Sequence, residues 1–279
     1  MIKPMLAHKF DEARINFKDF TYMQPKLDGV RCLFTKDGAF SRTGKQFMNV
    51  QHIEEELKEF FQQNPAMVLD GELYNHDLRN DFEKIISLVR KQKPTDEDRS
   101  EACRLTQYHV YDYTNKCMNC TVNYRYRLSQ LTSLDIYSPS IHYVESRRVK
   151  SIKQAKDFHT RKLAKGYEGS ILRTNTPYKH GRSFGLMKFK DFSDTEATIV
   201  DYQEGKGKRT GTLGKFIMQD DDGNIFGCPP GKGYNYSDLR CMLENIHKYM
   251  GQRATFTYFE RTKAGSYRHP LFKTLRNYE

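Results

Sequence analysis

The chain has 279 residues, which is enough for one large domain or two smaller ones with a sizeable core. Hydrophobic residues make up 37% of the chain, and 18 Phe with 18 Tyr supply packing mass, so the composition excludes a disordered protein. The formal net charge of +11 favours a polyanionic partner, and nucleic acid before others.

Predicted strands and helices alternate over the first two thirds of the chain. Residues 20–45 read as strand, turn, strand, turn, with a hairpin signal at 36–38. Helical spacing at 50–63 places Ile53, Leu57, Phe60 and Phe61 on one stripe. The expected order continues with a strand at 66–75, a helix at 80–92, a charged loop at 93–102, a strand at 104–114, a helix, glycine-rich turn and strand at 151–173, and a strand at 183–192.

The pattern changes after about residue 191. Residues 196–228 read as two strands with glycine-rich turns, and 237–251 as one helix with Ser237 or Asp238 as N-cap and Gly251 as its stop. Strands at 253–262 and 269–279 close the chain. Short strands with one helix favour a small barrel of the oligonucleotide-binding (OB) kind. We therefore predict an α+β protein of two domains, 1–190 and 191–279.

No apolar run reaches the length of a signal peptide or a membrane span, so we expect a cytoplasmic protein with no membrane contact. The six cysteines are then expected to be reduced. Cys117 and Cys120 form a CxxC pair, but a structural zinc site would require a second close pair, and Cys228 and Cys241 lie far apart. We expect no zinc.

The stretch QPKLDGVRC at 24–32 places charged residues where a strand core does not need them. Lys26 and Asp28 share a face in extended chain, Gly29 permits a close approach, and Arg31 offers a fork of donors suited to phosphate. A lysine acts as a nucleophile when its amine is deprotonated. A lone lysine in a strand is usually a solvated side chain, so the assignment depends on what accompanies it.

Two further strands carry charged pairs at the same spacing. Asp70 and Glu72 alternate in one strand, Lys188 and Lys190 in another, and Glu168 precedes Gly169 between them. Carboxylates suit Mg²⁺, and lysines suit the charge of a phosphate in the transition state. Each pair alone is consistent with a solvated strand face, but three pairs at period two favour a site.

The usual glycine-rich phosphate loops are absent, since the sequence has neither GxxxxGK[ST] nor a GxGxxG after a strand. Residues 204–215, EGKGKRTGTLGK, are rich in glycine and lysine without that spacing. We predict a basic turn in which Lys206, Lys208 and Arg209 contact a nucleic-acid backbone.

The segment KLDGVR at 26–31 resembles the KxDGxR signature of the covalent nucleotidyltransferases, which comprise ATP-dependent DNA ligases, RNA ligases and mRNA capping enzymes. Further segments resemble family blocks in the family's order: KPMLA at 3–7, SRTGK at 41–45, LDGEL at 69–73, YHVYDY at 108–113, YEGSILR at 167–173, LMKFK at 186–190 and YRHPLFKTLR at 267–276. The last of these is similar to the end of small phage-like DNA ligases. The resemblance runs nearly end to end.

The resemblance implies a role for each matching residue. Lys26 corresponds to the nucleophile, Tyr111 to the residue that stacks on adenine, and Gln24 to the one that reads its edge. Glu72 and Glu168 correspond to metal-associated carboxylates. The full set implied to bind the nucleotide is Gln24, Arg31, Arg42, Glu72, Tyr111, Lys188 and Lys190. Arg42, with Arg31, is also a candidate for gripping phosphate at a nick.

The implied fold is a nucleotidyltransferase domain of ATP-grasp-like antiparallel sheets with helices, followed by an OB-fold. The implied reaction transfers AMP from ATP to Lys26, then to a 5′-phosphate, and ends when a 3′-hydroxyl displaces AMP at a nick in duplex DNA. Mg²⁺, or Mn²⁺ in its place, would assist. We expect a monomer in the cytoplasm of a cell or of a virus's host.

One block departs from the family pattern. Larger members carry RxDK in the terminal barrel, whereas FERTKAG here has Arg261 and Lys263 without the aspartate.

The main alternative is an RNA ligase or RNA/DNA hybrid ligase with the same chemistry, because contacts to the 2′-hydroxyl are not readable from sequence. The terminal block favours DNA. A GTP-using capping enzyme, a catalytically dead nucleic-acid-binding module and a scaffold protein are weaker alternatives, since a binder need not keep a nucleophile.

Overall fold

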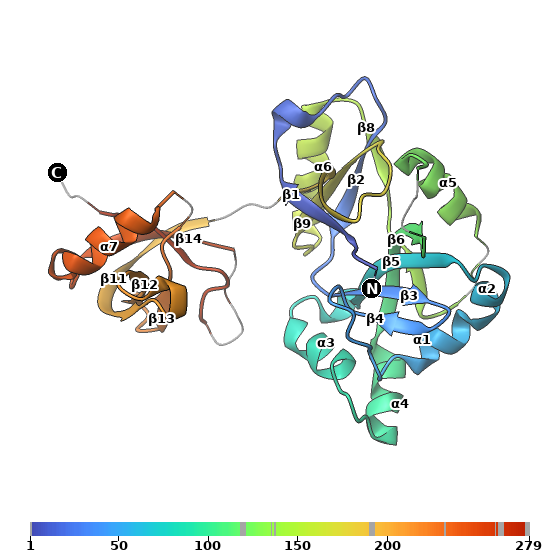
Figure 1. The fold of residues 1–279 in the computed structure, drawn as a ribbon, viewed down its shortest axis with the longest axis horizontal. Coiled ribbons are helices and arrows are strands. Elements are labelled where there is room, and N and C mark those ends of the chain that lie inside the picture. Colours follow the sequence, from blue (N-terminus) through green and yellow to red (C-terminus); the bar gives the residue numbers. More distant parts are fainter. Residues whose placement is uncertain are drawn as a thin grey trace. The chain divides into compact units, whose positions relative to one another are not determined.

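The computed structural model of the chain describes residues 2–117, 121–134, 136, 138–189, 193–231, 233–259, 261 and 265–276. The chain divides into two compact units, Met1–Lys190 and Asp191–Glu279 (Figure 1). Each unit has a hydrophobic core of its own. In the described part of the chain, no helix combines the length and apolar character that crossing a membrane requires.

Two five-stranded sheets form the unit Met1–Lys190. The strands of the first sheet are, in spatial order, β1 (Met5–Lys9), β10 (Gly181–Phe189), β9 (Gly169–Thr174), β2 (Thr21–Lys26) and β8 (Arg147–Val149). The strands of the second are β4 (Gly38–Phe40), β3 (Val30–Thr35), β5 (Met67–Tyr74), β6 (Gln107–Asn115) and β7 (Ile141–Tyr143). Pairing is antiparallel except at two edges, β1 with β10 and β6 with β7, which are parallel.

Helices cover both sheets of this unit. They are α1 (Gln51–Glu56), α2 (Lys58–Gln63), α3 (Phe82–Val89), α4 (Asp96–Leu105), α5 (Tyr124–Ser133) and α6 (Ile152–Ala164), with short 3₁₀ turns η1 (Glu12–Arg14) and η2 (His76–Leu78). Helix α6 packs on β2, β8 and β9 (Figure 1). Its N-cap is Ser151, whose hydroxyl accepts a hydrogen bond from the Gln154 amide at 3.3 Å.

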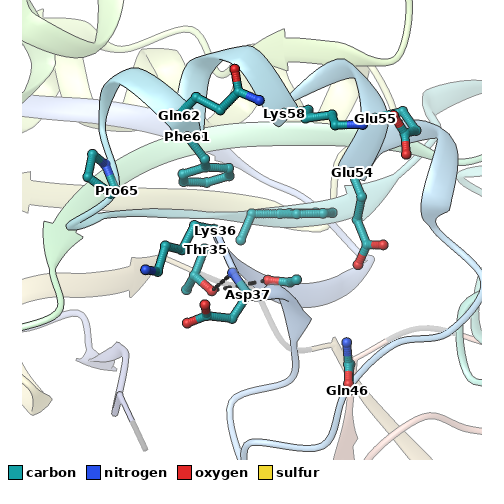
Figure 2. A pocket seen from close by; sticks show the side chains of 12 residues that line it. Thr35, Lys36, Asp37, Gln46, Glu54, Glu55, Lys58, Phe61, Gln62 and Pro65 are labelled. Atoms are coloured by element: carbon teal, nitrogen blue, oxygen red, sulfur yellow. Dashed lines mark hydrogen bonds and ion pairs between the residues drawn. The ribbon is translucent and has the colours of Figure 1, made fainter.

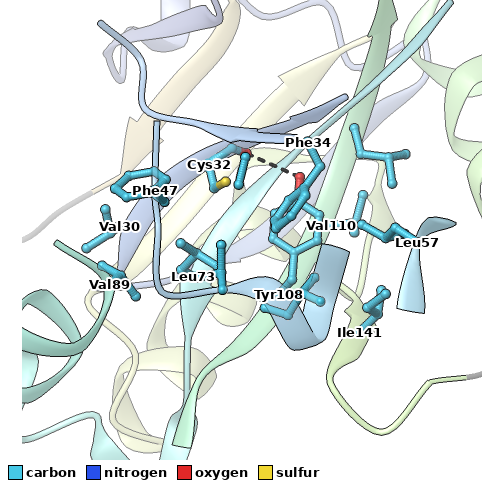
Figure 3. Close-up of a cluster of buried hydrophobic side chains, with 14 of the residues drawn as sticks. Val30, Cys32, Phe34, Phe47, Leu57, Leu73, Val89, Tyr108, Val110 and Ile141 are labelled. Carbon is cyan, nitrogen blue, oxygen red and sulfur yellow. Dashed lines mark hydrogen bonds between the residues drawn. The ribbon is translucent and has the colours of Figure 1, made fainter. Parts of the chain in front are cut away.

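The predicted helical stripe at 50–63 is confirmed in the larger core. Ile53, Leu57 and Phe61 are buried there, although Leu57 separates α1 from α2. Figure 3 shows how β3 supplies Cys32 and Phe34 to the same cluster. The Tyr108 hydroxyl, buried among these side chains, donates a hydrogen bond to the Cys32 carbonyl at 3.2 Å (Figure 3). A buried phenol normally finds such a partner, so the polar tip of Tyr108 is satisfied within the core.

The prediction of a charged loop at 93–102 was wrong, because most of this segment forms α4. Thr95 and Asp98 form a capping box that satisfies two amide groups at the start of the helix. Three acidic residues in the first turn also favour the positive end of the helix dipole. Only Ala102 is buried, so the helix presents almost no apolar stripe from which it could be read.

In the unit Asp191–Glu279, the residues that the structure describes form one sheet and one longer helix. In spatial order its strands are β13 (Ile225–Cys228), β12 (Leu213–Gln219), β11 (Ser193–Glu204), β14 (Arg253–Tyr258) and β15 (Leu271–Leu275), joined by α7 (Tyr236–Glu244) and the 3₁₀ turns η3 (Gly207–Arg209) and η4 (Ile246–Lys248). The chain just beyond β13 returns to β15, since Pro230 bridges Phe272 in parallel. The two edges of the sheet therefore approach each other.

Three details of this unit differ from the expectation. Residues 196–228 belong to three strands instead of two, because the segment 225–228 pairs with β12 as β13. The N-cap of α7 is Asn235, and Asp238 serves as the third helical residue of a capping box. The helix proper ends at Glu244, before the predicted stop at Gly251.

Candidate active site

Lys26 ends β2 and lies beside Glu168, which immediately precedes β9. The Lys26 ammonium forms an ion pair with the Glu168 carboxylate, and the Glu168 amide donates to the Lys26 carbonyl at 3.2 Å. Gly169 lies opposite Lys26 in the sheet and allows the chain to pass close enough for these two contacts. Its φ is 149°, and a Cβ there would lie 2.5 Å from the Phe189 carbonyl oxygen. A glycine is therefore required where β10 approaches the loop that carries Glu168.

The tight turn after Lys26 packs against the protein's own β5. A Cβ on Gly29 would lie 2.4 Å from the Leu73 carbonyl oxygen and 2.8 Å from the Glu72 side chain. What approaches Gly29 closely is thus a neighbouring strand. Asp28, half-buried in the same turn, does not line the cavity described below.

Arg31 is held in place by Asp70. The Arg31 Nε and Nη2 atoms donate to the two carboxylate oxygens of Asp70 at 2.9 and 2.5 Å, and Nη1 donates to the Met5 carbonyl at 2.7 Å. Tyr178 donates its hydroxyl to Asp70 at 2.6 Å. Asp70 is fully buried, and its carboxylate orients the Arg31 side chain.

Glu72 lies opposite Arg31 in the β3–β5 pair. Burial raises the pKa of Glu72 to about 7. The positive charges of Lys26 and Arg31 lower this pKa, and the negative charge of Glu168 raises it further. The Tyr111 hydroxyl donates to Glu72 at 3.4 Å. A carboxyl group poised near neutrality beside a lysine and a second carboxylate is typical of functional sites.

A cavity of about 200 Å³ brings most of the predicted site residues together. Those that line it are Gln24, Lys26, Arg31, Arg42, Glu72, Tyr111 and Lys188. Six of them come from the two sheets, from β2 and β10 on one side and from β3, β5 and β6 on the other, and Arg42 comes from the turn at 41–45. Lys190 lies outside the described residues.

Sequence reasoning missed one residue of this cavity, Arg173, although it stands in the quoted segment YEGSILR. Arg173 donates to the Gln24 side-chain oxygen and to Asp112, both at 2.6 Å. The Gln24 amide nitrogen in turn donates to the Tyr124 and Ser146 hydroxyls at 2.9 and 2.8 Å. Both ends of the Gln24 amide are therefore held inside the protein. The signal available in the sequence was an arginine within the apolar strand segment GSILRT, and the structure shows that it is buried.

A second hollow, of about 510 Å³, adjoins the first and shares Arg31, Arg42 and Glu72 with it. Lys45 and Arg90 add two further cations to its lining. Arg42 is exposed on the turn at 41–45. The Ser41 amide donates a hydrogen bond to the Lys45 carbonyl at 2.8 Å and closes this turn. The two hollows together form a basic surface leading from Lys26.

Another hollow of about 510 Å³ lies between the β3–β4 hairpin and helices α1 and α2 (Figure 2). Figure 2 shows Glu54 and Phe61 reaching from the helices, and Thr35 hydrogen bonding to the Asp37 amide below them. None of the predicted site residues that the structure describes lines this hollow. Its size alone does not connect it with the predicted chemistry.

The predicted basic turn at 204–215 joins β11 to β12. Lys206, Lys208 and Arg209 are exposed on it. The Gly205 amide donates to the Thr212 carbonyl at 2.9 Å and closes the turn. The cations thus project from a defined hairpin. In the same unit, Arg261 donates to Asp222 at 2.9 Å and to the Tyr267 hydroxyl at 2.6 Å, while Lys263 lies outside the described residues.

Five cysteines fall within the described residues and form no disulfide there: Cys32, Cys103, Cys117, Cys228 and Cys241. Cys120, the second member of the CxxC pair, lies outside them. Among the described side chains, no group of three His, Cys, Asp or Glu is placed to hold a metal ion. Any ion bound near Glu72 and Glu168 would need ligands from elsewhere.

Comparison with known proteins extends along both units. A sequence model described as the ATP-dependent DNA ligase domain matches residues 4–190, and one described as the DNA ligase OB-like domain matches residues 204–276. The DNA ligase of African swine fever virus (strain Badajoz 1971 Vero-adapted) is 32% identical over 232 residues, covering 76% of this chain and 52% of the viral protein. The DNA ligase of Haemophilus influenzae is 26% identical over 237 residues, covering 84% and 79%.

The chain spans about half the length of the viral relatives that it matches. Among solved structures, a Lig E DNA ligase superposes with a TM-score of 0.81 at 24% identity, covering 99% of this chain and 100% of the other. The ATP-dependent DNA ligase of bacteriophage T7, in complex with ATP, superposes with a TM-score of 0.58 at 19% identity, covering 98% of each.

These matches confirm the expected fold, a nucleotidyltransferase domain followed by an OB-like domain. The match to the ATP-dependent DNA ligase domain alone covers more than half of the sequence. The chain belongs to the family of ATP-dependent DNA ligases.

Proposed function

We propose that the chain seals nicks in duplex DNA, joining a 3′-hydroxyl to a 5′-phosphate at the expense of ATP through a lysyl-AMP on Lys26. The observation that carries the proposal is one cavity. Lys26, ion-paired to Glu168, stands in its wall together with Glu72, Arg42 and Lys188. A nucleophile, carboxylates and cations are the groups that phosphoryl transfer requires.

In the first step the Lys26 amine, having lost its proton, attacks the α-phosphorus of ATP. The new P–N bond replaces the bond to pyrophosphate, which leaves. The ion pair with Glu168 holds the amine in the cavity wall before the attack, so little positional entropy remains to be lost. Lys188 and Arg42 would offset charge on the phosphate oxygens. Lys190 is proposed for the same role on the family resemblance alone.

The acidic side chains of the site suit a hard divalent cation. Glu72 and Glu168 would hold Mg²⁺, or Mn²⁺, because they offer oxygen donors and their mutual repulsion contributes to the raised pKa of Glu72. When bound, the ion would neutralise charge on the phosphate groups. Substrate phosphates and water would complete its coordination, as is usual for Mg²⁺.

The aromatic wall of the cavity would receive the adenine. Tyr111 lines the cavity, with the Arg31 and Arg173 guanidinium carbons 5.6 and 5.4 Å from its ring centroid. These contacts fix the plane of the ring on which a base would stack. Gln24 keeps lone-pair capacity on its side-chain oxygen after accepting from Arg173, and that oxygen is the candidate reader of the adenine amino group.

In the later steps the 5′-phosphate at the nick displaces Lys26 from the adenylate, and the 3′-hydroxyl then displaces AMP. We assign these steps to Met1–Lys190 as the adenylation domain and duplex binding in part to Asp191–Glu279 as the OB-fold domain. Arg42 and the adjoining basic hollow would grip the 5′-phosphate, and the basic turn would contact the backbone. The active species is proposed to be a monomer.

Labelling with α-³²P-ATP and Mg²⁺ tests the nucleophile. Wild type should take up acid-labile label without DNA, because a phosphoramidate hydrolyses in acid. Lys26→Ala should take up none. Lys84→Ala is the matched control, since Lys84 is also ion-paired to a glutamate, Glu101, but lines none of the cavities above. Label on the Lys26→Ala variant would remove Lys26 from the reaction.

Sealing assays test the substrate. Nicked DNA/DNA, RNA/DNA and RNA/RNA duplexes are compared side by side, each with ATP, NAD and GTP. We expect ATP-dependent joining of the DNA/DNA duplex. Faster joining of RNA strands would replace the proposal with an RNA ligase, and labelling by GTP in place of ATP would point to capping chemistry.

A further inference from the structure

We infer that the unit Met1–Lys190 has a second contact surface for the phosphates of its duplex substrate, a groove between β8 and α6 that is separate from the Lys26 cavity. The β8–α6 groove is a hollow of about 400 Å³. Its polar lining consists of Arg147, Arg148, Lys150, Gln154, Asp157 and Arg161. It shares no lining residue with the Lys26 cavity or with the adjoining basic hollow. The inference rests on the proposed function.

The charges in the groove are unbalanced. Four cations face one carboxylate, that of Asp157. Arg147, Lys150 and Arg161 are exposed, and none of them forms an ion pair with any residue that the structure describes. Like charges gathered at one place repel each other, and the first turn of α6 carries no acidic residue to balance them. A bound polyanion would relieve this repulsion.

One arginine of the groove is already oriented. The guanidinium carbon of Arg148 lies 4.0 Å from the centroid of the Phe20 ring, and that of Arg125 lies 4.0 Å from the same ring. Stacking on an aromatic face restricts the side chain before any ligand arrives, so less conformational entropy is lost on binding. Arg125 contacts the same ring but does not line the groove, so the positive charge extends beyond the groove.

The groove belongs to the sheet that carries the nucleophile. β8 is the edge strand beside β2, and Arg147 lies opposite Met23, three residues before Lys26. At 3.3 Å per residue this is about 10 Å along the strand. Side chains alternate between the two faces of a strand, so Arg147 lies on the face of the sheet that α6 covers and Lys26 lies on the opposite face. A duplex bound with its nick at Lys26 extends well beyond that distance and would meet the groove where it runs past β8, the edge strand of the sheet.

The lining chemistry selects the phosphate backbone over other ligands. Arginine forks match phosphate oxygens in bidentate geometry. Among the residues that the structure describes, no aromatic side chain lines the groove, so the base stacking that single-strand binders use has no partner among them. Such a surface would add affinity without reading sequence, as a nick-sealing enzyme requires.

The experiment compares Arg147→Gln/Arg161→Gln with a control, Arg99→Gln/Arg104→Gln. The control removes the same charge from two exposed arginines of α4 that line none of the hollows above and form no ion pair with any described residue. Binding of a fluorescein-labelled nicked DNA duplex is measured by anisotropy across a salt series. Uptake of label from α-³²P-ATP, which requires no DNA, verifies that each variant is folded.

The salt slope is the slope of the logarithm of the binding constant plotted against the logarithm of the salt concentration. For the groove variant this slope should be shallower by about 2, because each lost phosphate contact removes about 0.9 from it. Between 50 and 200 mM salt its affinity should therefore fall about tenfold less than that of wild type. The control should keep the wild-type slope. Equal slopes for the two double variants would overturn the inference. If wild type took up no label at all, the proposed function would fail instead, while the anisotropy would still report on the groove.

Discussion

Replacing Asp70 with alanine should destabilise the unit Met1–Lys190 by about 3–5 kcal/mol, the usual cost of removing one partner from a buried ion pair. Asp70 is fully buried and receives two hydrogen bonds from Arg31, at 2.9 and 2.5 Å, and one from the Tyr178 hydroxyl at 2.6 Å. The Arg31 side chain is itself only 17% exposed. Without Asp70 its charge would stay in a poorly hydrated site, and the Tyr178 hydroxyl would lose its acceptor.

Urea unfolding followed by hydrogen-exchange mass spectrometry resolves the effect by segment. Peptides from β3 and β5 should show the loss of protection, and peptides from Asp191–Glu279 report whether the loss is confined to one unit. The double variant Arg31→Met/Asp70→Leu should recover much of the lost stability, since replacing a buried pair by apolar residues is often neutral. A cost below about 1 kcal/mol for Asp70→Ala would refute a structural role for this pair.

Three more outcomes are expected. The pKa of Glu72 is raised from 4.5 to about 7 in the fold, so its contribution to stability is present below pH 4.5 and is lost as pH rises through about 7. For this half-buried group the loss is at most about 3 kcal/mol, and denaturant unfolding of Glu72→Gln should lack that decline. Gly169→Ala should reduce label uptake more than tenfold because its Cβ meets the Phe189 carbonyl. Gly181→Ala, with φ 126° but open space, controls for backbone strain, and equal uptake by both would contradict this reasoning. Neutralising the three cations of the basic turn should make the salt slope of duplex binding shallower by about 3 without changing label uptake, and an unchanged slope would exclude the turn from the interface.

Strand periodicity singled out three charged residues as candidates for the site. Lys26, Glu72 and Lys188 each stand in a strand where a charge has no packing role, and the structure places all three in one cavity. Alternation in a strand is a local property that the sequence displays directly, which is why these residues could be named as candidates. The sequence pattern did not predict α4, whose exposed surface carries almost no apolar stripe and whose capping box was the only local signal.

Partners across the fold could not be read in the same way. The sequence shows Asp70 and Glu72 as an equivalent pair. In the structure, Asp70 accepts hydrogen bonds from Arg31, whereas Glu72 lines the cavity and has a raised pKa. The difference depends on burial and on Tyr178, which is 108 residues away from Asp70. Likewise, nothing local indicated that the Gln24 amide would be held by Arg173, 149 residues further on.

By itself, the sequence determined the family, the order of its blocks and the identity of the candidate nucleophile, because these depend on residue types at short spacing. Only the tertiary structure decided which charges are paired, which line the cavity and which gather in the β8–α6 groove without an ion-pair partner among the described residues. The physical reason is that solvation and ion pairing are set by neighbours in space, and strand pairing brings together residues that the chain keeps far apart.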